Sequence, residues 1–146
     1  MDVVDKFYKE AVEFCQYIEN RVITQDSVAE LLEMLMTLYI DGLHLPDMEP
    51  DSVDDGTDKT IENVKLKMEI PDYYQELFNP LEDEEIVGCD LYDDFLDIRK
   101  DLLKGINEYG AGYKGNAIFE WKLGLNEYWG KHATDAMRAF HSIRTR

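Results

Sequence analysis

Cysteine is scarce in this sequence, which has only two among 146 residues. Cys15 and Cys89 lie far apart, without a Cys-x-x-Cys pair or a matching pair of histidines beside them. The sequence therefore predicts neither a disulfide framework nor a zinc site. We expect both cysteines to be small buried hydrophobic side chains in a reducing compartment.

Long apolar segments are missing as well. No run approaches the roughly 20 apolar residues that a helix needs to cross a bilayer. Residues 1–9 are charged and amphipathic, without the apolar core of a secretory signal. We therefore expect a cytoplasmic protein with no part in the membrane.

Basic residues are few, with 15 lysines and arginines against 32 aspartates and glutamates, which gives a formal charge of −17. Such a charge repels the phosphates of nucleic acids and anionic membrane surfaces, so we expect neither as a partner. It attracts a basic protein, a cationic ligand or a divalent metal ion. Acidity that serves solubility alone is the simpler alternative.

The common catalytic motifs do not occur in the sequence. It has no GxSxG, no Walker loop, no HExxH and no glycine-rich nucleotide fingerprint. Several large enzyme classes therefore lose support. Whether the protein is an enzyme stays open at this point.

What the sequence does contain is a regular apolar pattern, in which hydrophobic residues recur every three or four positions. This pattern predicts main helices over residues 4–18, 28–43, 90–109 and 115–143, the last with a bend near Trp129 and Gly130. A chain of this length fits one domain, residues 1–146. The predicted fold is an all-α bundle of about five or six helices.

The segment between the second and third main helices is less regular. Residues 46–60 and 82–85 read as acidic loops, and residues 64–70 alternate like a strand. No second strand candidate is apparent, so a real strand there would most simply pair with its counterpart in another copy. We therefore expect a monomer or a homodimer.

A further short helix is predicted to begin at Pro71, because proline is well placed in the first turn of a helix. Asn79 and Pro80 would end it. This helix would carry the apolar and aromatic residues Tyr73, Tyr74, Leu77 and Phe78.

An acidic stripe follows one face of the predicted helix over residues 90–109. Its members recur three or four positions apart and are Asp90, Asp94, Asp97 and Asp101, with Asp93 at the edge of the stripe. Hard cations such as Mg²⁺ or Mn²⁺ prefer carboxylate oxygens, and the string DDFLD matches the DDxxD pattern that holds magnesium against a diphosphate. The alternative is a solvated helix face, because the apolar residues centre on the opposite side.

His132 is the candidate catalytic residue. It lies at the border of the predicted apolar stripe of the last helix, where it can reach a carboxylate on a neighbouring helix. Contact with Asp94 or Asp97 would make a metal site or an acid–base pair. A simple hydrogen-bonded border histidine is the alternative. Arg138 falls opposite Trp129 on this helix and is positioned to pair with the acidic stripe.

Two long strings, GCDLYDDFLDIRKDLLKGI and EYWGKHATDAMRAFH, together with an LP after the second helix and an FNP near residue 80, resemble a bacterial family of domains of unknown function, DUF5063. The resemblance covers most of the chain and implies a small helical protein without an assigned activity. The positions that match the family pattern are Asp93, Asp94, Asp97, Asp101, Trp129, Gly130, His132, Ala136, Arg138 and His141. Among these, the resemblance makes Trp129, Arg138 and His141 candidate binding residues.

Two functional hypotheses follow. The first is a non-enzymatic interaction module whose acidic face binds a basic protein. The second is a divalent-metal-dependent hydrolase of phosphoester or diphosphate substrates, with the stripe between Asp90 and Asp101 as metal ligands and His132 as base or support.

Overall fold

The computed structural model describes residues 1–51, 61–82 and 85–146. Within these ranges the chain forms five α-helices, one 3-10 turn and four short strands. In chain order they are α1 (Val3–Asn20), β1 (Val22–Ile23), η1 (Gln25–Ser27), α2 (Val28–Leu43), β2 (Lys67–Met68), β3 (Tyr73–Leu77), β4 (Ile86–Asp90), α3 (Leu91–Gly110), α4 (Lys114–Glu127) and α5 (Trp129–Arg144). The predicted, mostly helical fold is confirmed.

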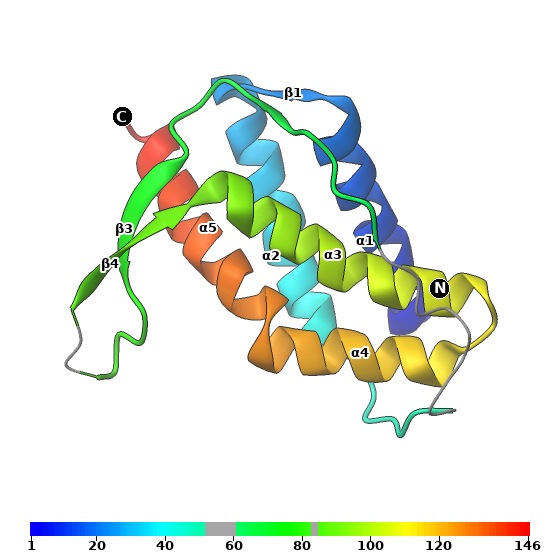
Figure 1. Cartoon of the computed structure of the whole chain (residues 1–146). Coiled ribbons are helices and arrows are strands. Elements are labelled where there is room, and N and C mark those ends of the chain that lie inside the picture. Colours follow the sequence, from blue (N-terminus) through cyan, green and yellow to red (C-terminus); the bar gives the residue numbers. More distant parts are fainter. Residues whose placement is uncertain (52–60, 83–84) are drawn as a thin grey trace.

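The helices pack around a core of aromatic side chains. Helix α3 crosses the front of the molecule in Figure 1 and contacts α1, α4 and α5. Phe7 on α1 lies against both tryptophans of the core, with ring centroids 4.9 Å from Trp121 and 5.9 Å from Trp129. All three side chains are fully buried. Burial of these aromatic side chains stabilises the bundle, together with that of aliphatic ones such as Leu31 and Leu35.

The boundaries of the main helices follow the sequence pattern closely. Asp90 caps α3, because its Oδ1 accepts from the backbone N–H of Tyr92 at 2.7 Å. Beyond the other end of this helix, Gly112 has φ +94°, a conformation that favours glycine. The predicted bend in the last helical stretch is also confirmed, since α4 ends at Glu127 and α5 begins at Trp129.

The alternating segment over residues 64–70 is a strand over Lys67–Met68 alone. It pairs in parallel with β1 of the same chain, Val22 opposite Lys67 and Ile23 opposite Met68. The expectation that it would need a second copy as its partner was therefore wrong. A two-residue strand such as β1 is too short to show a period of its own.

The short helix predicted after Pro71 is wrong, because residues 73–77 form strand β3. This strand pairs antiparallel with β4, from Tyr73 opposite Asp90 to Leu77 opposite Ile86. Paired tyrosines and the β-branched start of β4 favour strands, and the pairing outweighs the helix-starting preference of proline. The hairpin projects from one end of the bundle (Figure 1).

The two predicted acidic loops are only partly described. Residues 46–51 contain no helix or strand, and Asp51 accepts a hydrogen bond from the backbone N–H of Gly115 at 2.7 Å. The predictions for residues 52–60 and 83–84 lie outside the described residues.

The two cysteines differ in burial. Cys15 is 3% exposed, as predicted, whereas Cys89 is only half-buried on β4 and faces a cleft. The prediction that both are buried is thus wrong for Cys89, since it rested on the number and spacing of the cysteines, which do not reveal how exposed each one is. No helix in the described part of the chain is long and apolar enough to cross a membrane.

Candidate functional site

A cleft of about 730 Å³ lies between the hairpin and helices α3 and α5. Strands β3 and β4 form one wall, and the first turns of α3 and α5 form the other. Six carboxylate side chains line it, namely Glu76, Asp90, Asp93, Asp94, Glu127 and Asp135. Aromatic side chains of Tyr73, Phe78 and Tyr128 also line it, and all three are more than half exposed.

A hydrogen-bonded network joins three elements beside this cleft. Asp94 on α3 is 5% exposed, and its Oδ1 accepts from Nδ1 of His132 on α5 at 2.8 Å. Its other oxygen, Oδ2, accepts from the hydroxyl of Tyr74 on β3. One buried carboxylate therefore ties the hairpin and α5 to α3. This confirms the expectation that His132 reaches a carboxylate of a neighbouring helix.

The charge state of His132 follows from its surroundings. The hydrogen bond to Asp94 raises the pKa of His132, which burial opposes and the charges of Asp94, Asp97 and Asp101 support. Its Nε2 lies 3.4 Å from Oδ2 of the exposed Asp97. The two carboxylates beside the ring favour its protonated form, in which both nitrogens donate.

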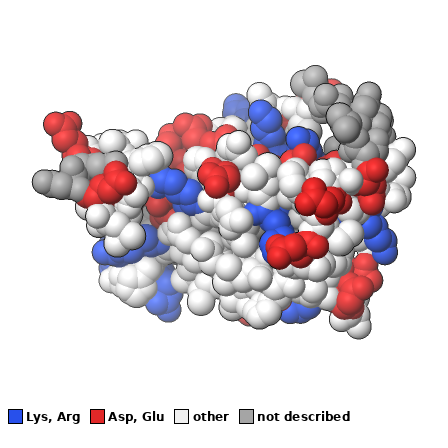
Figure 2. Space-filling view, turned by 90° about the horizontal axis from the view of Figure 1, so that it is seen from below, with Lys and Arg blue, Asp and Glu red and all other residues white. Residues whose placement is uncertain are grey.

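Asp93, at the rim of the cleft, has several carboxylates close to it. Desolvation and the charges of Asp90, Asp97, Asp94 and Asp72 raise the pKa of Asp93. A positive group entering the cleft would relieve this repulsion. The face shown in Figure 2 carries both acidic and basic side chains around a broad uncharged area.

The cleft already holds one amine of the protein itself. The ammonium of Lys131 lies 2.8 Å from Oδ2 of Asp135 and 4.8 Å from the centre of the Phe78 ring. A cation between a carboxylate and an aromatic face is a favourable arrangement for lysine and arginine. Lys131 therefore shows that this surface can bind an amine through a carboxylate and an aromatic ring.

Neither Cys89 in the cleft nor Tyr74 beside it is an activated nucleophile. Cys89 lines it, but burial, together with the charges of Asp135 and Asp94, raises the pKa of the thiol. Burial and the hydrogen bond to Asp94 likewise raise the pKa of Tyr74. Both groups are neutral near pH 7 and lack the reactive anionic form.

The acidic stripe divides between the cleft and solvent. Asp90, Asp93 and Asp94 line the cleft. Asp97 is exposed, and its carboxylate lies beside Nε2 of His132. Asp101 is half-buried beyond the cleft, and burial raises its pKa. The alternative of a purely solvated stripe therefore holds for only part of it.

Within the described residues, no group of three or more histidine, cysteine, aspartate or glutamate side chains is arranged to hold a metal ion. The geometry thus gives no support to Mg²⁺ or Mn²⁺ as a cofactor. The metal-dependent hydrolase remains a prediction from sequence only.

The three binding candidates lie in different places. Trp129 is fully buried, and its Nε1 donates to the carbonyl of Trp121 at 3.0 Å, so it belongs to the core. Arg138 is exposed and bonds to Ser142, away from the acidic stripe with which it was expected to pair. His141 is exposed on α5 and does not line the cleft.

Several residues of the cleft escaped the sequence reasoning. Phe78 in the cleft and Tyr74 beside it were assigned to a short helix, and Lys131 and Asp135 were passed over beside His132. The signal that could have found them is the pair YYQEL and IVGCD, two strand-forming runs separated by an asparagine, a proline and acidic residues. Such a pair is typical of a hairpin, and it would have placed Tyr74 opposite α3 and α5.

Comparisons with known proteins agree with this fold. The model of a domain of unknown function, DUF5063, matches residues 1–146. The chain resembles the crystal structure of protein BF1032 from Bacteroides fragilis, with a TM-score of 0.74 and 18% identity, over 100% of this chain and 97% of that one. A comparison with curated proteins found no match. At this level of identity the likeness concerns the fold alone.

Proposed function

The chain belongs to the DUF5063 family of domains of unknown function, and from the geometry of its cleft we propose that it binds a basic segment of a partner protein. The observation that carries the proposal is the convergence of six carboxylates on one aromatic-walled cleft. Among the described residues that line it, Lys131 and His132 are the only basic ones. Both are already engaged by carboxylates.

Charge and shape together favour a peptide segment over a small cation. Exposed aromatic rings on the hairpin and at Tyr128 offer flat faces for arginine or lysine side chains. The carboxylates on α3 and α4 surround them, so that several basic residues can be bound at once. Such contacts increase the association rate and specificity, and they weaken as salt is added.

The test uses a fluorescein-labelled peptide of alternating arginine and serine, followed by fluorescence anisotropy. We expect saturable binding at low salt that weakens with added NaCl. The double variant Asp93→Asn/Glu127→Gln should bind about fivefold more weakly, since each rim charge contributes up to about 1 kcal/mol.

The matched control is Glu13→Gln/Glu33→Gln, which removes the same charge from exposed positions on α1 and α2. We expect less than a twofold effect from it. An equal loss of peptide affinity in both double variants would mean that the protein's net charge, and not the cleft, accounts for binding. Equal binding of a glutamate–serine peptide would contradict the proposal outright.

A further inference from the structure

Strand β3 has an open edge. Antiparallel strands exchange backbone hydrogen bonds at every second residue pair. Asp72 and Leu91 form such a pair just before the first pair of the hairpin, because the N–H of Leu91 donates to the carbonyl of Asp72 at 2.7 Å. The alternation therefore turns the N–H and C=O groups of Tyr73, Gln75 and Leu77 away from β4. Within the described residues, no backbone hydrogen bond outside the hairpin involves these three.

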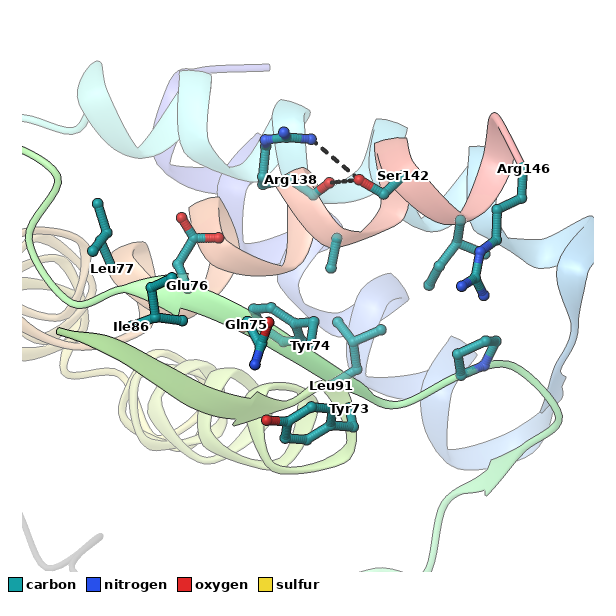
Figure 3. A pocket seen from close by; sticks show the side chains of 13 residues that line it. Tyr73, Tyr74, Gln75, Glu76, Leu77, Ile86, Leu91, Arg138, Ser142 and Arg146 are labelled. Atoms are coloured by element: carbon teal, nitrogen blue, oxygen red, sulfur yellow. Dashed lines mark hydrogen bonds between the residues drawn. The ribbon is translucent and has the colours of Figure 1, made fainter.

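A second cleft, of about 540 Å³, follows this edge. All five residues of β3 line it, whereas β4, whose residues are all described, contributes Ile86 alone. Successive side chains of a strand point to opposite faces, so a cleft that touches every residue of β3 lies along the strand's edge. The opposite wall is the C-terminal half of α5, and Figure 3 shows β3 between β4 and this helix. An extended chain placed there would add a third strand to the hairpin.

The edge also lacks the features that usually prevent strand pairing. Proteins commonly protect an open edge with lysine, proline or a β-bulge. Strand β3 has the sequence YYQEL, which contains neither residue. Its register with β4 runs without a bulge from Tyr73 to Leu77. The edge can therefore accept another strand.

The floor of the second cleft is apolar. Leu91 is 1% exposed, and Ala139 and Ile143 are each 7% exposed. Every second side chain of an added strand would face this floor, because strand side chains alternate. The cleft therefore favours an extended peptide with apolar, β-branched residues at alternate positions.

The charges along the cleft give the peptide a direction. Figure 3 shows Glu76 and Leu77 towards one end of the cleft and Arg146 towards the other. A peptide that runs antiparallel to β3 has its amino-terminal end near Glu76 and its carboxyl-terminal end near Arg146. An acidic carboxyl-terminal end then meets the guanidinium group and stays away from the carboxylate.

A second copy of the chain fits this edge less well than a separate peptide. Each copy carries a net charge of −17, so two copies repel each other. The β3 edge of a second copy also has its own α5 beside it, which a single extended segment does not.

We propose that β3 binds an extended segment of a partner protein as an antiparallel third strand, with its acidic carboxyl-terminal end near Arg146. Main-chain hydrogen bonds supply the affinity of such strand addition, and pockets for alternate side chains supply the specificity. The proposal is independent of the acidic cleft, because the peptide carries no basic side chain.

The test uses isothermal titration calorimetry with the acetylated peptide Thr-Val-Thr-Val-Glu, whose negative charge keeps it out of the acidic cleft. We expect saturable binding of one peptide per protein. Two further peptides carry N-methyl groups, one on the odd and one on the even backbone amides. Because only every second amide faces β3, one of them should lose binding and the other should keep it. Equal losses in both, or no binding of the parent peptide, would overturn the proposal.

The variant Gln75→Pro removes an N–H from the open edge while leaving the pairing with β4 intact. It should bind the peptide about tenfold more weakly, through the lost hydrogen bond and the added ring. The matched control Gln75→Thr keeps the N–H and should change the affinity less than twofold, with thermal melts showing that both variants are folded. Binding to Gln75→Pro as tight as to the wild type would contradict strand addition.

The variant Arg146→Gln tests the direction of the peptide. It should bind the parent peptide about threefold more weakly and leave the affinity for a peptide that ends in glutamine amide unchanged. Equal losses for both peptides would contradict the antiparallel placement. Sedimentation of the free protein tests the second copy as occupant, and we expect a monomer. A dimer that Gln75→Pro dissociates would assign the edge to a second copy and overturn the proposal.

Discussion

Replacing Gly130 by alanine is expected to lower the free energy of unfolding by about 3 kcal/mol, the upper end of what overpacking usually costs. A Cβ added at Gly130 would stand 1.9 Å from the carbonyl oxygen of Leu125 and 2.8 Å from its carbonyl carbon. Both are backbone atoms, so no side-chain rotation can relieve the clash. Helix α5 would have to move away from α4.

The consequence reaches the acidic cleft, because Lys131 and His132 follow Gly130 directly on α5. The melting temperature should fall by about 10 °C for a cost of this size. Gly110→Ala is the matched control, because a Cβ there meets nothing within 4 Å. That substitution should be neutral or add up to about 1 kcal/mol, as expected for alanine in a helix. A Gly130→Ala protein as stable as the wild type would contradict the tight α4–α5 junction.

Replacing Asp94 by alanine is expected to cost about 3 kcal/mol of stability, measured by urea unfolding at pH 7. The change removes the carboxylate that accepts hydrogen bonds from both His132 and Tyr74. Two partly buried donors then lose their acceptor. Asp97 is exposed and lies one helical turn after Asp94. Asp97→Asn removes the same charge and should cost less than about 0.5 kcal/mol. Equal losses in the two variants would mean that the buried network contributes nothing specific.

The same residue governs how stability depends on pH. The pKa of His132 is raised in the folded protein above the ordinary histidine value of about 6.5, chiefly by the hydrogen bond to Asp94. Its contribution to stability is therefore complete below about pH 6.5 and is lost as the pH rises through the raised value. In Asp94→Asn this loss should be smaller, and unfolding at pH 6 and pH 9 measures the difference. An identical loss in wild type and variant would separate His132 from Asp94.

The helical bundle could be predicted from the sequence because its helices each present one continuous apolar stripe. Leu91, Phe95, Ile98 and Leu102 recur at helical spacing, and all are buried. The acidic stripe was also located correctly, since the same period fixes the opposite face. The pairing of His132 with Asp94 was an open alternative, because periodicity places a residue on a face but does not orient two helices.

The hairpin could not be predicted in the same way, and with it most of the cleft was missed. Strand pairing between residues 73–77 and 86–90 is a contact between separate segments, which local preferences such as that of Pro71 do not reveal. Tyr74 gained its role only through this pairing. The two-residue strands β1 and β2 are shorter still and depend on the packing of the helices beside them.

The most direct test of whether the acidic cleft binds a basic segment is to locate the bound peptide. A titration of ¹⁵N-labelled protein with the arginine–serine peptide, followed by two-dimensional NMR, reports on each backbone amide. We predict that the amides of Phe78, Cys89, Asp93 and Lys131 shift most, in proportion to the amount of peptide bound. The largest shifts on the exposed α2 residues Met36 and Ile40, with none around the cleft, would contradict the proposal.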